Sequence, residues 1–356
     1  RDRIPTGPHR VRDFAFGCEE GRRCSRGKAG VLGLGSKRIT TSPDPPEQPP
    51  HLSAMCVWEG AADWYRDMTH HGGMLSTFWE NWYDMQVKTV QYGAGERGKR
   101  SRVHAELVCG PEALSDAELA RNRADFGTEI ASHPMDDDYH KARSAKWDKI
   151  VTPLFSAANW GGQGLHPRGN FEGFVRAASR QKWLEAHGIE HWTHFYTDYG
   201  REQQLRFFDY FLHGKKDGWA KQPKVLLQVR HLDKFVSRAE SEWPLKRTRW
   251  TKFYLDPSTM TLTTNRPPGA AQLKFAAMSD GLTFLTPPLE KETEITGPSA
   301  LKLFASSSTS DADFFVVLRV FTGDLKEIVF QGAIDPHTPI GQGWLRASHR
   351  KLDKKL

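Results

Sequence analysis

The sequence predicts an α/β protein with a largely parallel sheet, followed by an all-β region. Up to about residue 213, short apolar runs alternate with helical segments, which is typical of a parallel sheet covered by helices. Beyond Gly214, strand-like runs are separated by Pro, Gly, Ser and Asp turns, with no helix signal between them. That spacing favours a β-sandwich or jelly roll.

The first part contains three short apolar runs, which predict buried strands at 52–58, 150–156 and 182–186. Because helical connections join them, we expect the three strands to be parallel neighbours. Residues 59–147 have helical character, with a capping-box start at Ser115 and Glu118. Further helices are predicted at 170–180 and 201–212.

The second part is predicted to form strands at 225–229, 250–255, 301–305, 314–321 and 327–330. Residues 1–50 differ from both parts. They carry eight arginines, and a proline-rich run at 43–50 cannot form a helix. We interpret this stretch as loop or disorder.

Composition narrows the class of protein. A chain of 356 residues is long enough for two or three domains, and 20 Phe, 12 Trp and 8 Tyr exclude a mostly disordered chain. No apolar run is long enough for a transmembrane helix, and no signal peptide pattern opens the chain. The formal charge of +7 comes from interspersed acids and bases, unlike the clustered charge of a nucleic-acid binder. Four cysteines do not make a disulfide scaffold.

The segment 187–191 fits the H-x-x-E-H pattern of inverted zinc peptidases. In that interpretation His187 and His191 bind zinc from one helix, and Glu190 is the base. Gly188 lies inside the pattern, and a strand-like run leads into it. We therefore keep the zinc peptidase only as an alternative.

His191 also suits a serine hydrolase. In an α/β-hydrolase the nucleophile lies on a sharp strand-to-helix turn, and the acid and then the histidine follow along the chain. The histidine takes the proton of the nucleophile, and the acid holds the histidine in the right tautomer. His191 follows the predicted strand 182–186, where such a histidine belongs.

From His51 onward the chain resembles the cocaine esterase and X-Pro dipeptidyl-peptidase family of α/β-hydrolases. Glu190-His191 closes the segment that reads G-P-W-S-H in the family, and Asn159-Trp160-Gly161-Gly162 stands where the family has G-W-Y-D. The other similar segments are Asp63-Trp64-Tyr65-Arg66-Asp67 with Gly72-Gly73, Phe207-Phe208-Asp209-Tyr210-Phe211-Leu212-His213-Gly214, Thr296-Gly297-Pro298, and 343–350. The resemblance implies a partial hydrolase sheet with a helical cap and a galactose-binding-like jelly roll.

The chain departs from the family at the nucleophile. Residues 27–33 resemble the strand that enters the elbow, but the serine position is then Gly35, and Ser36 comes one place late. Five prolines between Lys37 and Pro50 replace the helix that should follow. Because the elbow geometry and an oxyanion donor depend on that helix, Ser36 is a doubtful nucleophile, and we expect this chain to be catalytically impaired.

The acid also departs from the family, because its position is occupied by Gly162. Glu59, just after the strand that ends at Trp58, is the best substitute. Aromatic residues could wall an apolar substrate pocket, with core packing as the equally plausible role: Trp58, Trp64, Tyr65, Phe78, Trp79, Trp82 and Trp160.

These observations give three domains: a divergent segment 1–50, a hydrolase core 51–213 with a cap at 60–148, and a truncated jelly roll 214–356. In the family, the first sheet strands would precede Arg1 and the last jelly-roll strands would follow Leu356. We expect a cytoplasmic serine hydrolase acting on a small ester, amide or X-Pro peptide, without metal or organic cofactor, nucleic-acid partner or membrane. A non-catalytic binding or scaffold protein built on the jelly roll is a further alternative. The oligomeric state is left open.

Overall fold

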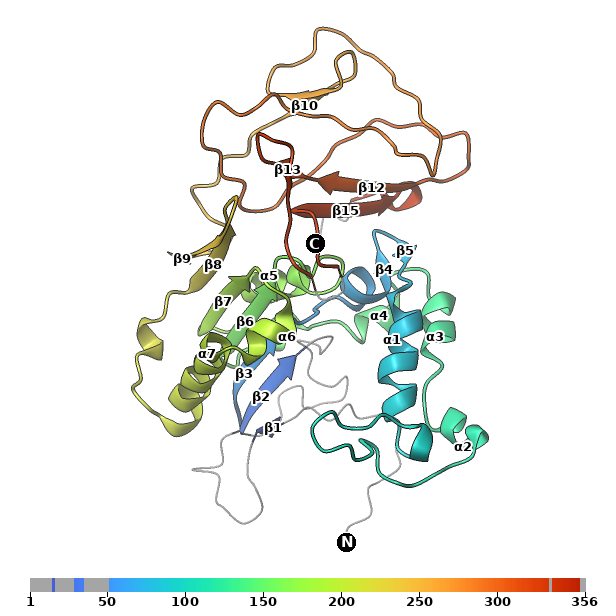
Figure 1. Ribbon diagram of the computed structural model, residues 1–356, viewed down its shortest axis with the longest axis vertical. Helices are drawn as coiled ribbons and strands as arrows, with labels where there is room; N and C mark the ends of the chain where they lie inside the picture. Colours follow the sequence, from blue (N-terminus) through green and yellow to red (C-terminus); the bar gives the residue numbers. More distant parts are fainter. Residues whose placement is uncertain (1–14, 17–28, 35–50, 333–334, 353–356) are drawn as a thin grey trace.

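The computed structural model describes residues 15–16, 29–34, 51–332 and 335–352. Within them, seven strands form one twisted sheet in the order β1-β2-β3-β6-β7-β8-β9 (Figure 1). Strands β2 to β8 are parallel, and β1 and β9 pair antiparallel at the two edges. The strands are β1 (Ala15–Phe16), β2 (Ala29–Leu34), β3 (Leu52–Trp58), β6 (Leu154–Asn159), β7 (Lys182–His187), β8 (Val225–Arg230) and β9 (Phe235–Glu240).

The three strands expected from apolar runs are confirmed as parallel neighbours, β3, β6 and β7. Strand β6 begins at Leu154 rather than at residue 150, because Pro153 has no N–H to donate to the ladder. The strand predicted at 225–229 was wrongly grouped with the C-terminal strands. It is β8, and it pairs with β7 and β9 in the parallel sheet.

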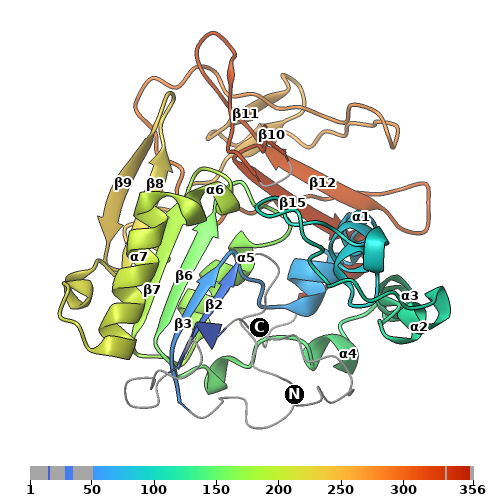
Figure 2. The ribbon, with the colours of Figure 1, turned by 60° about the horizontal axis from the view of Figure 1, so that its bottom comes forward.

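Helices cover both faces of the sheet (Figure 2). Successive residues of β7 point to opposite faces. Trp183 packs in one cluster with Phe207 of α7, and Leu184 packs in another with Phe174 of α5. The helices are α5 (Pro167–Arg176), α6 (His191–Tyr196) and α7 (Asp198–Phe208), which continues as the π-helix η6 (Asp209–His213). These correspond to the helices predicted at 170–180 and 201–212, with shifted ends.

Residues between β3 and β6 form a cap at one side of the sheet, made of short helices (Figures 1 and 2). The capping box predicted at Ser115 is confirmed at the start of α2. The elements are η2 (Trp64–Thr69), β4 (His70–His71), β5 (Met74–Leu75), α1 (Phe78–Gln86), η3 (Lys88–Val90), η4 (Gly95–Arg97), α2 (Asp116–Arg121), α3 (Phe126–Ser132), α4 (Asp138–Lys141) and η5 (Trp147–Lys149).

The C-terminal part is rich in β-structure but irregular, with three two-stranded pairs in the residues described there. The strand predicted at 301–305 is wrong, since Leu301, Leu303 and Phe304 are exposed and lie in no strand. The elements are η7 (Trp219–Lys221), β10 (Tyr254–Asp256), β11 (Thr261–Thr263), β12 (Asp313–Leu318), β13 (Val320–Phe321), β14 (Glu327–Ile328), β15 (Gly341–Arg346) and η8 (Ala347–His349). No helix of the described ranges is long and apolar enough to cross a membrane.

Candidate active site

Polar side chains gather at the carboxyl edge of the parallel sheet. Glu59 directly follows β3, Asn159 ends β6, and His187 ends β7. All three are fully buried. Because β3, β6 and β7 are neighbours, their carboxyl ends bring these residues together, which is where α/β proteins place their functional groups.

Glu59 has an unusual backbone for its residue type. Its φ of 58° lies in the left-handed region, which costs free energy for a residue with a side chain and is concentrated at functional sites. The N–H of Gly60 donates to Oδ1 of Asn170 at 2.9 Å, which fixes this turn. A Cβ built on Gly162 would lie 3.2 Å from Oε2 of Glu59. The Glu59 carboxylate therefore lies directly against the position of the expected acid.

The Glu59 carboxylate contacts a second buried group, the imidazole of His187. Oε1 of Glu59 lies 3.1 Å from Nε2 of His187, and Nδ1 of the same ring lies 2.8 Å from Oε2 of Glu185. Burial opposes protonation of His187, but Glu185 and Glu59 together raise its pKa to about 9. Burial raises the pKa of Glu59, with His187 acting in the opposite direction.

At Glu185, attraction by the neighbouring histidines outweighs the effect of burial on the pKa. Burial disfavours its charged form, but His187 and His194 lower its pKa to about 2. Glu185 and His187 therefore form a charged pair inside the protein.

The segment after β7 is held by side chains of two neighbouring strands. Nδ2 of Asn159 donates to the carbonyl of Ile189, and the N–H of Gly188 donates to Oε1 of Gln228 at 3.1 Å. His191 is the first residue of α6, and its side chain lies outside what the structure describes. Because His187 is in a strand and His191 begins a helix, the single helix that the H-x-x-E-H pattern requires is absent from 182–196.

The expected nucleophile, Ser36, and Gly35 lie outside the described residues. Strand β2, predicted as the strand that enters the elbow, ends at Leu34, whose register partner on β3 is Trp58. The chain thus leaves β2 at the same edge of the sheet as Glu59.

The predicted pocket aromatics are distributed over separate clusters. Trp58 packs in the sheet core, with its ring 5.5 Å from that of His187. Trp64 packs in the cap cluster with Phe78, Trp79 and Trp82. Tyr65 donates its hydroxyl to Pro134 in the cap, and Trp160 stacks on Phe171 and Phe330. Of this set, the Trp58 ring lies beside the ring of His187, and the backbone N–H of Trp160 donates to the carbonyl of His187 at 2.9 Å. A substrate-binding role for these aromatic residues stays a prediction.

Comparisons with known proteins account for both parts of the chain. Residues 20–196 match the model of the X-Pro dipeptidyl-peptidase (S15) family, and residues 217–356 match the X-Pro dipeptidyl-peptidase C-terminal non-catalytic domain. The chain belongs to the cocaine esterase and X-Pro dipeptidyl-peptidase family of hydrolases. The resemblance expected from the motifs is confirmed.

Relatives in this family are longer than the chain. Cocaine esterase of Rhodococcus sp. (strain MB1 Bresler) is 32% identical over an alignment of 146 residues, with a coverage of 30% of this chain and 25% of that protein. A crystal structure of a CocE/NonD family hydrolase from Staphylococcus aureus has a TM-score of 0.69 and 27% identity, over 86% of this chain and 52% of that one. A second structure from the same organism, at 1.95 Å, gives the same TM-score with 26% identity, over 86% of this chain and 51% of that one. The chain thus spans about half the length of these solved family members.

Sequence reasoning missed Glu185, and it missed His194 altogether. The signal for the first was the alternation Glu185-Ala186-His187 within a strand, which places both polar side chains on one face. The sequence pattern pairs His187 only with His191. The structure instead brings it together with Glu59, Glu185 and His194.

Proposed function

We propose that the chain is built as a serine-type acyl hydrolase for small esters, amides or X-Pro peptides, with His191 as general base and Glu59 as the acid. The observation that supports this best is the contact between Glu59 and Gly162. Gly162 stands where the family has its aspartate, and Oε2 of Glu59 lies 3.2 Å from the Cβ that such a residue would carry. A carboxylate from β3 therefore replaces the one missing from the chain after β6.

The two residues would divide the work as in other triads. His191 takes the proton of the attacking hydroxyl and later returns it to the leaving group. Glu59 stabilises the protonated histidine and fixes its tautomer. A buried carboxylate with a strained backbone suits this role, since strain is retained where the surrounding structure demands one geometry.

This chain departs from the family pattern at the nucleophile. We propose that the chain, with its present sequence, is nearly inactive. Gly35 occupies the serine position directly after β2. In a serine protease, removing the nucleophile of the triad lowers the catalytic rate on the order of 10⁶-fold. Ser36 could act only with its hydroxyl about 2.6–3.2 Å from a ring nitrogen of His191.

A rescue experiment tests these assignments. Turnover of an activated ester is measured for the wild-type chain, Gly35→Ser, the double variant Gly35→Ser/His191→Ala, and a control with the hydroxyl two residues earlier, Gly33→Ser. We expect Gly35→Ser alone to exceed the wild-type rate, by roughly 10-fold or more, because it supplies the missing hydroxyl. If Gly35→Ser equals Gly33→Ser, the assignment of position 35 is wrong, and the non-catalytic binding alternative is favoured.

A further inference from the structure

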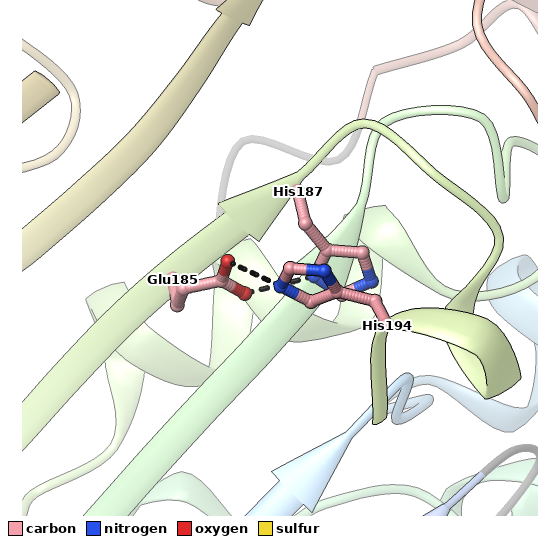
Figure 3. A group of neighbouring side chains, drawn as sticks. All are labelled: Glu185, His187 and His194. Atoms are coloured by element: carbon pink, nitrogen blue, oxygen red, sulfur yellow. Dashed lines mark hydrogen bonds and ion pairs between the residues drawn. The ribbon is translucent and has the colours of Figure 1, made fainter. Parts of the chain in front are cut away.

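Three buried side chains converge at the carboxyl end of β7: Glu185, His187 and His194 (Figure 3). Glu185 and His187 come from the same face of β7, and His194 comes from α6. Oε2 of Glu185 lies 2.8 Å from Nδ1 of His187, and Oε1 lies 3.3 Å from Nε2 of His194. The two imidazole rings are stacked, with their centroids 4.3 Å apart. One carboxylate thus directs each of its oxygens at a different histidine.

The donor types are those of a transition-metal site, and the three residues are close enough to reach one ion once the stacked rings turn toward it. Imidazole nitrogen and carboxylate oxygen are zinc ligands with bonds of about 2.0–2.2 Å, which places neighbouring ligand atoms roughly 3–3.5 Å apart. Here one ligand atom from each of the three residues lies within 4.8 Å of the others. With both oxygens of Glu185, the group offers four donor atoms.

Two of these donors make no other hydrogen bond within the described residues. Oε1 of Glu185 and Nε2 of His194 lie within ion-pair distance of each other but lack hydrogen-bond geometry. The two residues are 1% and 5% exposed. Buried polar atoms are almost always satisfied by hydrogen bonds. These two atoms contact each other only as an ion pair at 3.3 Å, so each can still accept a further partner.

The surroundings complete the site. A histidine that binds a metal usually gives its other ring N–H to a carboxylate. Nε2 of His187 lies 3.1 Å from Oε1 of Glu59, which is ion-pair distance without hydrogen-bond geometry, so a small turn of the ring would form this bond. That contact leaves Nδ1 as the ligand atom. Glu59 and Glu185 bring two carboxyl groups into a fully buried region. When the ion binds, His187 gives up its proton, and the ion takes the place of that proton as the counter-charge of Glu185.

We propose that Glu185, His187 and His194 bind one divalent transition-metal ion of the zinc class, with Glu59 as the outer carboxylate on His187. The ion ties the end of β7 to α6 and so fixes the segment 188–190 that leads into His191. It is a structural site, because its ligands are buried. It differs from the H-x-x-E-H pattern, since its second histidine is His194 and His191 remains available for catalysis. The inference does not depend on the proposed hydrolysis.

Cobalt substitution tests the site directly. The full chain is treated with chelator, dialysed and titrated with Co²⁺ while the visible absorption of the ion is recorded, followed by displacement with Zn²⁺. We expect one equivalent to bind with a four-coordinate spectrum, and affinity at least 100-fold lower in His194→Ala and Glu185→Gln. Glu59→Gln is expected to lose 10–100-fold, as outer carboxylates do. His213→Ala, which removes an exposed histidine outside the cluster, is the matched control and is expected to bind normally.

A second measurement uses only the wild-type chain, so its outcome does not depend on whether a variant folds. Thermal unfolding of the wild-type chain should shift upward with Zn²⁺, because a ligand of the folded state stabilises by about 2.7 kcal/mol at 100 times its Kd. Binding of one equivalent by both His194→Ala and Glu185→Gln at wild-type affinity would place the metal elsewhere and overturn the proposal. So would the absence of any Co²⁺ spectrum or zinc-dependent shift in the wild type.

Discussion

Glu59 is a fully buried carboxylate in a turn with a φ of 58°, and it contacts His187. Its place after an apolar run and the glycine at position 162 predict it as the substitute acid. The structure supplies the physical link, since glycine at 162 leaves the space that the Glu59 carboxylate approaches. The positive φ of Glu59 and its contact with His187 were not predictable, because both depend on how β3, β6 and β7 align.

His70 is a second residue whose environment has measurable consequences. Its buried ring stacks on Tyr65 at 4.8 Å, and Nδ1 lies 3.0 Å from Oγ1 of Thr69. The pKa of His70 is lowered to about 4, and burial of the ring is the largest cause. Electrostatic repulsion lowers it further, from the nearby groups His140, His349, His71 and Arg346. The folded protein therefore holds this histidine neutral where an unfolded chain would protonate it.

We predict that His70 contributes a loss of stability as the pH is lowered from 6.5 to 4. In this window the unfolded chain binds a proton at His70 that the folded chain does not, so unfolding is favoured. The loss should be on the order of 2 kcal/mol. Urea unfolding at several pH values measures it. In His70→Gln, the free energy of unfolding should depend less on pH than in the wild type. The exposed control His231→Gln should show the same pH dependence as the wild type. Identical profiles for His70→Gln and the wild type would contradict the pKa assignment.

Among the elements, β3 was predicted with its observed bounds because a short apolar run between polar turns has one simple interpretation. Strand β8 was assigned to the wrong part of the chain. Its apolar pattern identifies a buried strand but not its partners, and pairing with β7 is set by the fold. The run at 301–305 shows the converse, since apolar residues do not form a strand without a partner.

Asn170 of α5 links the elements around the Glu59 turn. Its Oδ1 accepts from Gly60, and its Nδ2 donates to Val57 and to Oγ of Ser156. Asn170→Ala should therefore lower the free energy of unfolding by about 2–4 kcal/mol, because it leaves buried partners unpaired.

Chemical denaturation measures this loss. Asn122→Ala, on an exposed residue at the end of α2, is the control, with an expected change within about 0.5 kcal/mol. Equal losses in the two variants would show that the Asn170 bonds do not hold these elements together.

At the scale of the whole molecule, the C-terminal part packs closely on the parallel sheet. Gly161, just after β6, lies so near the 331–332 backbone that a Cβ there would come within 2.5 Å of Gln331. On the cap, the N–H of Arg346 donates to Gly72 at 2.8 Å. No sequence pattern identified these contacts, since a glycine that permits close approach looks like any turn glycine.

We predict that Gly161→Ala loosens this packing. The added methyl must displace backbone, a change that costs about 1–3 kcal/mol in tightly packed sites. Limited proteolysis followed by mass spectrometry should show faster cleavage after residue 240. Gly343→Ala, where a Cβ meets nothing within 4 Å, should be cleaved at the wild-type rate. Equal cleavage of all three proteins would mean that this contact does not hold the two parts together.

We propose that this member of the hydrolase family keeps a base, His191, and an acid, Glu59, but has glycine at position 35, where the nucleophile belongs. Labelling with a fluorophosphonate probe, read by mass spectrometry of the intact and digested chain, tests it most directly. The wild-type chain should be labelled no more than His191→Ala. Stoichiometric labelling of Ser36 that disappears in His191→Ala would contradict it.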